Sequence, residues 1–252
     1  MLHDLQKASM WKRASAFIFD FILIAILSVG IILLLSSLLG YDGYTDKLEG
    51  IYDKYEQQYK VDFDLSPEEY EKLNDDEKAI IDDAYAALTS DEEMLNTYYM
   101  IISLTFLMIT IGILVAFLVL EFTVPLLFKN GQTLGKKVFG VAVMRVDGVK
   151  INAPILFIRS VLGKYTLETM IPVMTVILIF FDAIDLAGIV IIGILTLVQF
   201  AMLIVTHTNS AIHDMLSSTV AVDMASQMIF DSRDEMLEYK KRVHAESVSR
   251  TE

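Results

Sequence analysis

The chain contains no cysteine and only four histidines among its 252 residues. The lack of cysteine excludes thiol catalysis, a cysteine-based zinc site and a disulfide-bonded domain. Two hydrolase motifs, the Gly-x-Ser-x-Gly elbow and the His-Glu-x-x-His pair, are also missing from the sequence. We therefore expect that the protein is not an enzyme, binds no metal at a dedicated site and needs no cofactor.

Charge is almost absent from three long apolar runs: Ala14–Leu39, Met100–Leu120 and Leu186–Thr206. Asp20 is the one charged residue in the first run. At 1.5 Å per residue, each run can cross a hydrocarbon core of about 30 Å. A fourth run, Thr169–Phe181, is shorter and needs Glu168 and Lys164 near the headgroups to reach a spanning length. The sequence thus predicts an all-α membrane protein built as a bundle of four transmembrane helices.

Acidic residues are concentrated in the loop between the first two spans. Between Tyr41 and Thr97 there are 18 acidic residues and 5 lysines, so this segment carries the whole net charge of −13. Two Ser-x-x-Glu patterns, beginning at Ser66 and Ser90, are typical of capping boxes at helix starts. We expect a small acidic helical insertion on the extracytoplasmic side of the membrane.

Lysine and arginine indicate the orientation of the chain in the membrane. They precede the first span, fill the segment between the second and third spans, and return as Lys240-Lys241-Arg242 in the tail. This pattern predicts cytoplasmic N- and C-termini, with the acidic loop and the short turn at Phe181–Asp185 outside. A three-span alternative would place the basic tail outside and is disfavoured.

The segment after the second span is expected to lie at the cytoplasmic interface. Asp147-Gly148 between apolar arms at 141–146 and 149–151 predicts a β-hairpin. Pro154 then begins an amphipathic helix on the membrane surface. The predicted parts are the N-terminus with the first span (1–40), the acidic cap (41–97), the second span (98–128), the interfacial segment (129–164), the last two spans (165–206) and the tail (207–252).

Ionisable residues lie within the first two spans. Arg13 and Asp20 are seven residues apart and share one helix face. Glu121 lies at a similar predicted depth on the next, antiparallel span. A carboxylate at that depth is costly unless it is protonated, paired or bound to a cation. We expect Asp20, Glu121 and Arg13 to form a proton and cation exchange site; the alternative is that these carboxylates pair with Arg13, Arg159 or the backbone to fix helix packing.

Polar residues also cluster after the last span. His213-Asp214 is a candidate proton relay or cytoplasmic gate that His207 could join, together with Arg159. The alternative is that these side chains cap the helix end by hydrogen bonding.

These motifs together resemble the RDD family of prokaryotic membrane proteins, named for one arginine and two aspartates. Arg13 and Asp20 match the opening pair, and Asp214 of His213-Asp214 matches the second aspartate. Residues 131–143 match the Gly-x-Thr-x-Gly-Lys stretch, and Arg159 matches an arginine usual in the following helix. The similarity covers about 13–39 and 98–223, and the acidic loop stands outside it.

The resemblance implies a fold more firmly than a reaction. Some family members are implicated in Na⁺/H⁺ antiport, and others act beside membrane proteins such as a signal-peptide peptidase. We expect a multi-pass protein of a prokaryotic plasma membrane that exchanges a monovalent cation or small solute for protons, either as a homo-oligomer or within a complex. The alternative is a non-transporting partner or regulator that uses its acidic outer loop. No nucleic-acid partner is expected.

Overall fold

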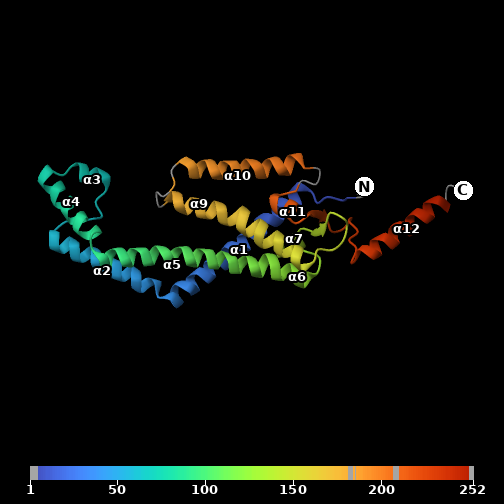
Figure 1. Cartoon of the computed structure of the whole chain (residues 1–252), viewed down its shortest axis with the longest axis horizontal. Helices are drawn as coiled ribbons and strands as arrows, with labels where there is room; N and C mark the ends of the chain where they lie inside the picture. The colour runs from blue at the N-terminus through green and yellow to red at the C-terminus, as the bar shows by residue number, and fades with distance from the viewer. Residues whose placement is uncertain (1–4, 181–183, 185, 207–209, 250–252) are drawn as a thin grey trace. The chain divides into compact units, whose positions relative to one another are not determined.

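The computed structural model describes residues 5–180, 184, 186–206 and 210–249, and most of them are helical (Figure 1). The chain divides into two compact units. One comprises Met1–Ser28 with Ile113–Glu252, and the other comprises Val29–Gly112. Helices α1 (Met10–Leu39) and α5 (Glu92–Phe117) contribute residues to both.

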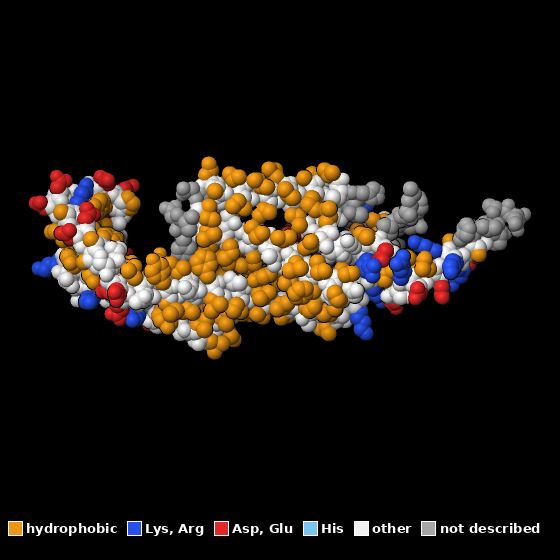
Figure 2. All heavy atoms as spheres, viewed as in Figure 1, with side chains coloured by type: hydrophobic (Ala, Val, Ile, Leu, Met, Phe, Trp, Pro, Cys, Tyr) orange, Lys and Arg blue, Asp and Glu red, His pale blue; other side chains and the backbone are white. Residues whose placement is uncertain are grey.

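Among the described residues, three helices are long and apolar enough to cross a membrane: Met10–Leu39, Glu92–Phe128 and Ala153–Phe180. Helix α10 (Leu186–Val205) is also apolar. Large apolar side chains on these helices point outward, with Leu33, Leu197 and Val205 among the exposed ones. Figure 2 shows hydrophobic side chains covering the surfaces of the long helices. Because water would not favour such a surface, lipid is its natural surrounding.

The unit Val29–Gly112 carries the acidic insertion, which folds into α2 (Tyr41–Tyr59), α3 (Pro67–Glu71) and α4 (Asp75–Thr89). Ile51, Leu88 and Met94 form its small core, and acidic side chains cover its outside (Figure 2). The expected helical character is therefore present.

Helix caps in this unit match the sequence prediction only in part. Ser66 forms the predicted capping box with Glu69. Asn74 and Glu77 form a second box that was not predicted. The prediction at Ser90 was wrong: its hydroxyl donates to Ala86 O at the end of α4, and Asp91 instead accepts the first amides of α5. Aspartate and serine are both good caps, so adjacent candidates compete.

The second and third long helices contain wide, π-type turns. The second continues from α5 through η1 (Leu118–Thr123) to α6 (Val124–Phe128). The third runs from α8 (Ala153–Phe157) through η2 (Ile158–Met170) to α9 (Ile171–Phe180). We expected a separate surface helix from Pro154, but the helix starting there is continuous with the third long apolar helix. Lys164 and Glu168 interrupt its apolar sequence, but Lys164 pairs with Glu121 and Glu168 contacts His213, so the helix can continue through them.

A two-stranded antiparallel sheet joins distant parts of the chain. Strand β1 (Val141–Arg145) pairs with β2 (Thr219–Asp223). The predicted hairpin at Asp147-Gly148 is present but short. Met144 bridges Lys150 and Arg145 N donates to Val149 O, on the edge of β1 opposite β2. Buried Ala142, Met144, Val220 and Val222 form the sheet core. The tail therefore folds back before ending in α12 (Arg233–Ser249).

Candidate functional site

Asp20 is buried on α1 and is held by the segment that follows the second long helix. Gly135 N donates to Asp20 Oδ1 over 2.7 Å, and the Thr133 hydroxyl donates to Asp20 Oδ2. Thr133 is also the N-cap of α7 (Leu134–Val138). The Thr-x-Gly-Lys stretch thus provides hydrogen-bond donors to the first-span carboxylate, as a buried carboxylate requires.

Gly135 lies directly against α1. A Cβ atom there would be 2.4 Å from Ala16 O and 2.9 Å from Asp20 Cγ. These contacts are with backbone and with a fixed carboxylate, so little can move aside. Only glycine allows α7 to approach α1 closely enough for the amide of residue 135 to reach Asp20.

Lys136 lies between two carboxylates on different helices. Its Nζ is 4.0 Å from Asp20 Oδ2 and 3.9 Å from Glu121 Oε2. Burial and the nearby charge of Lys164 lower the pKa of Lys136 to about 7, although Glu121 opposes this shift. The pKa of this ammonium group therefore falls where protons exchange under physiological conditions.

Glu121 is buried on the π-type turn η1 and has a second cationic partner. Lys164 Nζ, from η2, donates to Glu121 Oε1 over 2.5 Å. Lys136 and Lys164 thus reach the two oxygens of one carboxylate. Wide turns of this type are frequent at functional sites because they displace a side chain from regular helical positions.

Asp214, on α11 (Ile212–Leu216), forms a separate buried cluster with two arginines. Arg159 donates to Asp214 Oδ1 from Nη2 over 2.6 Å and from Nε over 3.1 Å. Arg13 Nη2 lies 3.5 Å from Asp214 Oδ2. Burial would raise the pKa of Asp214, but the charge of Arg159 outweighs it and lowers that pKa well below its usual range. Asp214 is thus ionised at physiological pH.

His213 joins α11 to the third long helix. Its Nδ1 lies 2.8 Å from Glu168 Oε2, and its backbone N donates to Glu168 Oε1 over 2.9 Å. Burial lowers the pKa of His213, although Asp214 opposes this shift. Gly163 permits the approach, since a Cβ there would lie 2.5 Å from His213 Cβ. The third histidine of the predicted relay, His207, lies outside the described residues.

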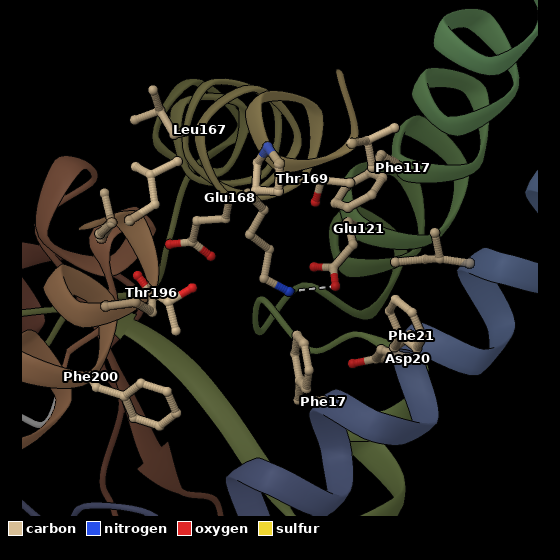
Figure 3. Close-up of a pocket in the computed structure, with 17 residues that line it drawn as sticks. Phe17, Asp20, Phe21, Phe117, Glu121, Leu167, Glu168, Thr169, Thr196 and Phe200 are labelled. Carbon is tan, nitrogen blue, oxygen red and sulfur yellow. Dashed lines mark hydrogen bonds and ion pairs between the residues drawn. The ribbon is translucent and has the colours of Figure 1, made fainter. Parts of the chain in front are cut away.

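A cavity of about 410 Å³ adjoins the Asp20 and Glu121 groups. α1, the second long helix, the third long helix and α10 supply its walls. Figure 3 shows Asp20 and Glu121 on one side of this space, with Glu168 and Thr196 across from them. Phe17, Phe21, Phe117 and Phe200 supply aromatic rings. The cavity therefore combines an ionic end with apolar walls.

The sequence-predicted residues fall into two clusters. Asp20 and Glu121 come together through Lys136, whereas Arg13 and Arg159 gather at Asp214 beside His213. Sequence reasoning missed the roles of Lys136, Lys164, Thr133 and Glu168. A search for cations matching each buried carboxylate could have found the lysines, because an unpaired buried charge is costly. Their role in function stays a prediction.

Long apolar helices with exposed apolar surfaces and internally paired charges define an integral membrane protein. The model of the RDD family matches residues 7–218. The chain belongs to the RDD family, a family of membrane proteins, and the resemblance seen in the sequence is confirmed. No curated protein and no solved structure matches the chain.

Proposed function

We propose that the protein exchanges protons for a cation across a prokaryotic plasma membrane, with Lys136, Asp20 and Glu121 as the exchanging group. The supporting observation is the placement of one buried ammonium 4.0 Å from one carboxylate and 3.9 Å from another. When Lys136 loses its proton, Asp20 loses its charged partner and Glu121 keeps Lys164. A cation then gains by taking the place of the ammonium, and reprotonation of Lys136 expels it. Proton and cation binding thus exclude each other.

The membrane arrangement we propose has four spans, with α10 as the last, and both termini in the cytoplasm. The distribution of lysine and arginine supports this orientation. Four helices enclose little space for a pathway, so we propose a homo-oligomer or a complex with another membrane protein. In this proposal the protein is not an enzyme and uses no cofactor. Arg13, His213 and Asp214 act on the cytoplasmic side as a gate held by Arg159.

Proton movement in liposomes tests the exchange. Purified protein is reconstituted with a pH-sensitive dye inside, and Na⁺ or K⁺ is added outside. The Lys136→Arg variant keeps the positive charge, but an arginine does not release its proton near neutral pH. Cation-driven proton movement is therefore expected to stop in this variant. The neighbouring exposed Lys137 gives a matched control, and Lys137→Arg is expected to behave as wild type. Unchanged proton movement in Lys136→Arg, or in Asp20→Asn, would contradict the mechanism.

The second candidate function is that of a non-transporting partner of another membrane protein. The balance of buried charge favours it: Arg13, Lys136, Arg159 and Lys164 offset Asp20, Glu121, Glu168 and Asp214. A neutral, fully paired interior is what a structural role requires. The acidic insertion would then supply the recognition surface through charge complementarity.

Co-purification from native membranes tests this second candidate. Full-length protein is compared with a variant in which exposed acids of the insertion are neutralised: Glu68→Gln, Glu71→Gln, Asp76→Asn and Asp83→Asn. A regulator is expected to lose a stoichiometric partner in the variant. An exchanger is expected to keep its cation-driven proton movement in the same variant.

A further inference from the structure

The cavity beside Asp20 and Glu121 is large and poor in oxygen ligands for a bare ion. Its volume is about 410 Å³ and its walls are mainly apolar. Dehydrated metal cations are held by several oxygens at short range, commonly six or more for calcium at about 2.3–2.6 Å. Within the described residues, no group of three or more His, Asp or Glu side chains is arranged to hold a metal ion. The cavity therefore suits an organic ligand that fills this volume better than it suits a bare metal ion.

The charge of the lining favours a cation. Asp20, Glu121 and Glu168 contribute three carboxylates. Lys164 lines the cavity beside them, and Lys136 lies 4.0 Å from Asp20 and 3.9 Å from Glu121, so two positive charges face three negative ones. Lys164 is bonded to Glu121, and Glu168 contacts His213, whose pKa is lowered by burial. With His213 neutral, the space carries an excess of negative charge. An anionic ligand would be repelled there.

One wall presents a hydrogen-bond acceptor that lacks a donor. Gln199 lines the cavity from α10, and its Oε1 is one of two buried side-chain atoms without a hydrogen-bond partner among the described residues. A buried amide oxygen normally accepts at least one hydrogen bond. Protein atoms cover this oxygen, and a rotation of the Gln199 side chain would let a ligand N–H group in the cavity supply the bond.

Aromatic rings supply the apolar part of the cavity wall. Phe17, Phe21, Phe117 and Phe200 surround the space (Figure 3). Aromatic faces attract ammonium groups and also bury apolar carbon. Phe17 and Phe200 are 63% and 60% exposed, so the cavity is bordered by side chains that also reach the lipid-facing surface. A ligand that partitions into the membrane can approach from that side.

From the acidic lining, the unpaired Gln199 oxygen and the phenylalanine walls, we infer that this cavity binds an organic ammonium ion with an apolar body, which reaches it from the lipid phase. The ammonium group lies among Glu168, Gln199 and the Asp20–Glu121 pair, and the apolar body lies against the rings. This inference names the class of cation for the exchange and rests on that proposed function for its coupling to protons.

Calorimetric titration of the full-length protein in detergent tests the site. The probe is 2-phenylethylammonium, and 2-phenylethanol is the neutral probe of similar shape. We expect 2-phenylethylammonium to bind at least about tenfold more tightly than 2-phenylethanol, since the alcohol can donate a hydrogen bond to a carboxylate but has no positive charge to pair with it. Equal binding of the two probes, or no binding of 2-phenylethylammonium, would overturn the inference.

Variants locate the binding within the cavity. Glu168→Gln and Gln199→Leu are each expected to weaken 2-phenylethylammonium binding, by roughly tenfold for the charge and several-fold for the acceptor. Gln199→Leu leaves the Glu168–His213 contact intact, so it remains informative if Glu168→Gln unfolds. The exposed Glu238→Gln serves as a control and is expected to bind as wild type. If Gln199→Leu and a correctly folded Glu168→Gln both bind 2-phenylethylammonium with wild-type affinity, the ligand lies elsewhere and the proposal is overturned.

Proton release separates this inference from the proposed function. Titrations in buffers of different ionisation enthalpy count the protons released as the amine binds. Binding that depends on Gln199 but releases no proton supports the ligand site and refutes exchange at Lys136. Sodium-driven proton movement in liposomes without any amine binding supports exchange and refutes the organic ligand.

Discussion

Arg159 and Asp214 form a buried ion pair with 2.6 Å between Nη2 and Oδ1. Their side chains are only 3% and 1% exposed, so neither charge can be solvated by water. The pair joins the third long helix to α11, 55 residues later in the chain. It thereby holds the segment that leads into β2 and the end of the folded core.

Breaking this pair is expected to destabilise the protein strongly. Arg159→Met leaves Asp214 buried with Arg13 as its remaining arginine partner in the cluster, at a predicted cost of about 3–5 kcal/mol. Arg145 and Asp147 make a pair with a similar distance of 2.7 Å whose side chains are 38% and 35% exposed. Arg145→Met should therefore cost at most about 1 kcal/mol. Thermal unfolding in detergent, followed by circular dichroism, compares the two; equal costs would contradict the argument from burial.

Titration of Lys136 gives a prediction about pH. Because the pKa of Lys136 is lowered to about 7 in the folded protein, from an ordinary value of 10.5, the folded state releases this proton at lower pH than the unfolded state. The Lys136 contribution to the free energy of unfolding should therefore rise as pH increases from about 7 to 10.5. In Lys136→Arg this rise should disappear.

NMR of reductively methylated lysines measures the same group directly. One resonance is expected to titrate near neutral pH in the wild type and to be missing from Lys136→Arg. Lys137→Arg is the control and should keep that resonance. A Lys136 resonance that titrates with the exposed lysines would refute the proposed role of its proton.

Gly135→Ala is expected to disturb the contact between α7 and Asp20. The added Cβ would overlap Ala16 O, so the segment must shift and its amide must leave the carboxylate, at a cost of about 1–3 kcal/mol or more. Gly50→Ala, in α2, is the matched control, because a Cβ there meets no described atom within 4 Å. That change should stabilise helix α2 by about 0.5–1 kcal/mol. Unfolding of both variants in detergent checks the opposite signs.

The β1–β2 pairing predicts that the tail residues up to Asp223 are part of the core. Val222→Asp would bury a carboxylate in the sheet core, where Val222 is fully buried, and should cost several kcal/mol or prevent folding. Val243→Asp changes an exposed residue of α12 and should be tolerated. Yield of monodisperse protein and its melting temperature are the readouts. Similar behaviour of the two variants would contradict the observed burial of β2.

Much of the membrane architecture could be predicted from the sequence because it depends on local composition. Long apolar runs with almost no charge identified the regions of α1, α5 and α10. The helix start at Ser66 was predicted from its capping box. The third long helix was predicted in two pieces, because Lys164 and Glu168 interrupt its apolar pattern. Their pairing with Glu121 and His213 removes the cost that suggested a boundary.

The partners within the site could not be predicted, because they depend on contacts between distant segments. Helical spacing put Arg13 and Asp20 on one face, but it could not show that Arg13 reaches Asp214 or that Thr133 and Gly135 hold Asp20. Asp147-Gly148 forms the predicted local turn. The pairing of β1 with β2, which buries Val220 and Val222, joins distant segments and could not be predicted from that turn.

The separation between Asp20 and its partners has a consequence for biosynthesis. Thr133 follows Asp20 by 113 residues, and Asp214 follows Arg13 by 201. The first helix therefore leaves the ribosome long before the groups that neutralise its charges have been made. Insertion of α1 must begin with Asp20 unpaired, at a cost below the ~2.5–3.5 kcal/mol of an aspartate at a helix centre, because Asp20 lies nearer the start of the helix. Its long apolar remainder carries the helix into the bilayer, and assembly of the charge clusters completes only after translation has passed α11.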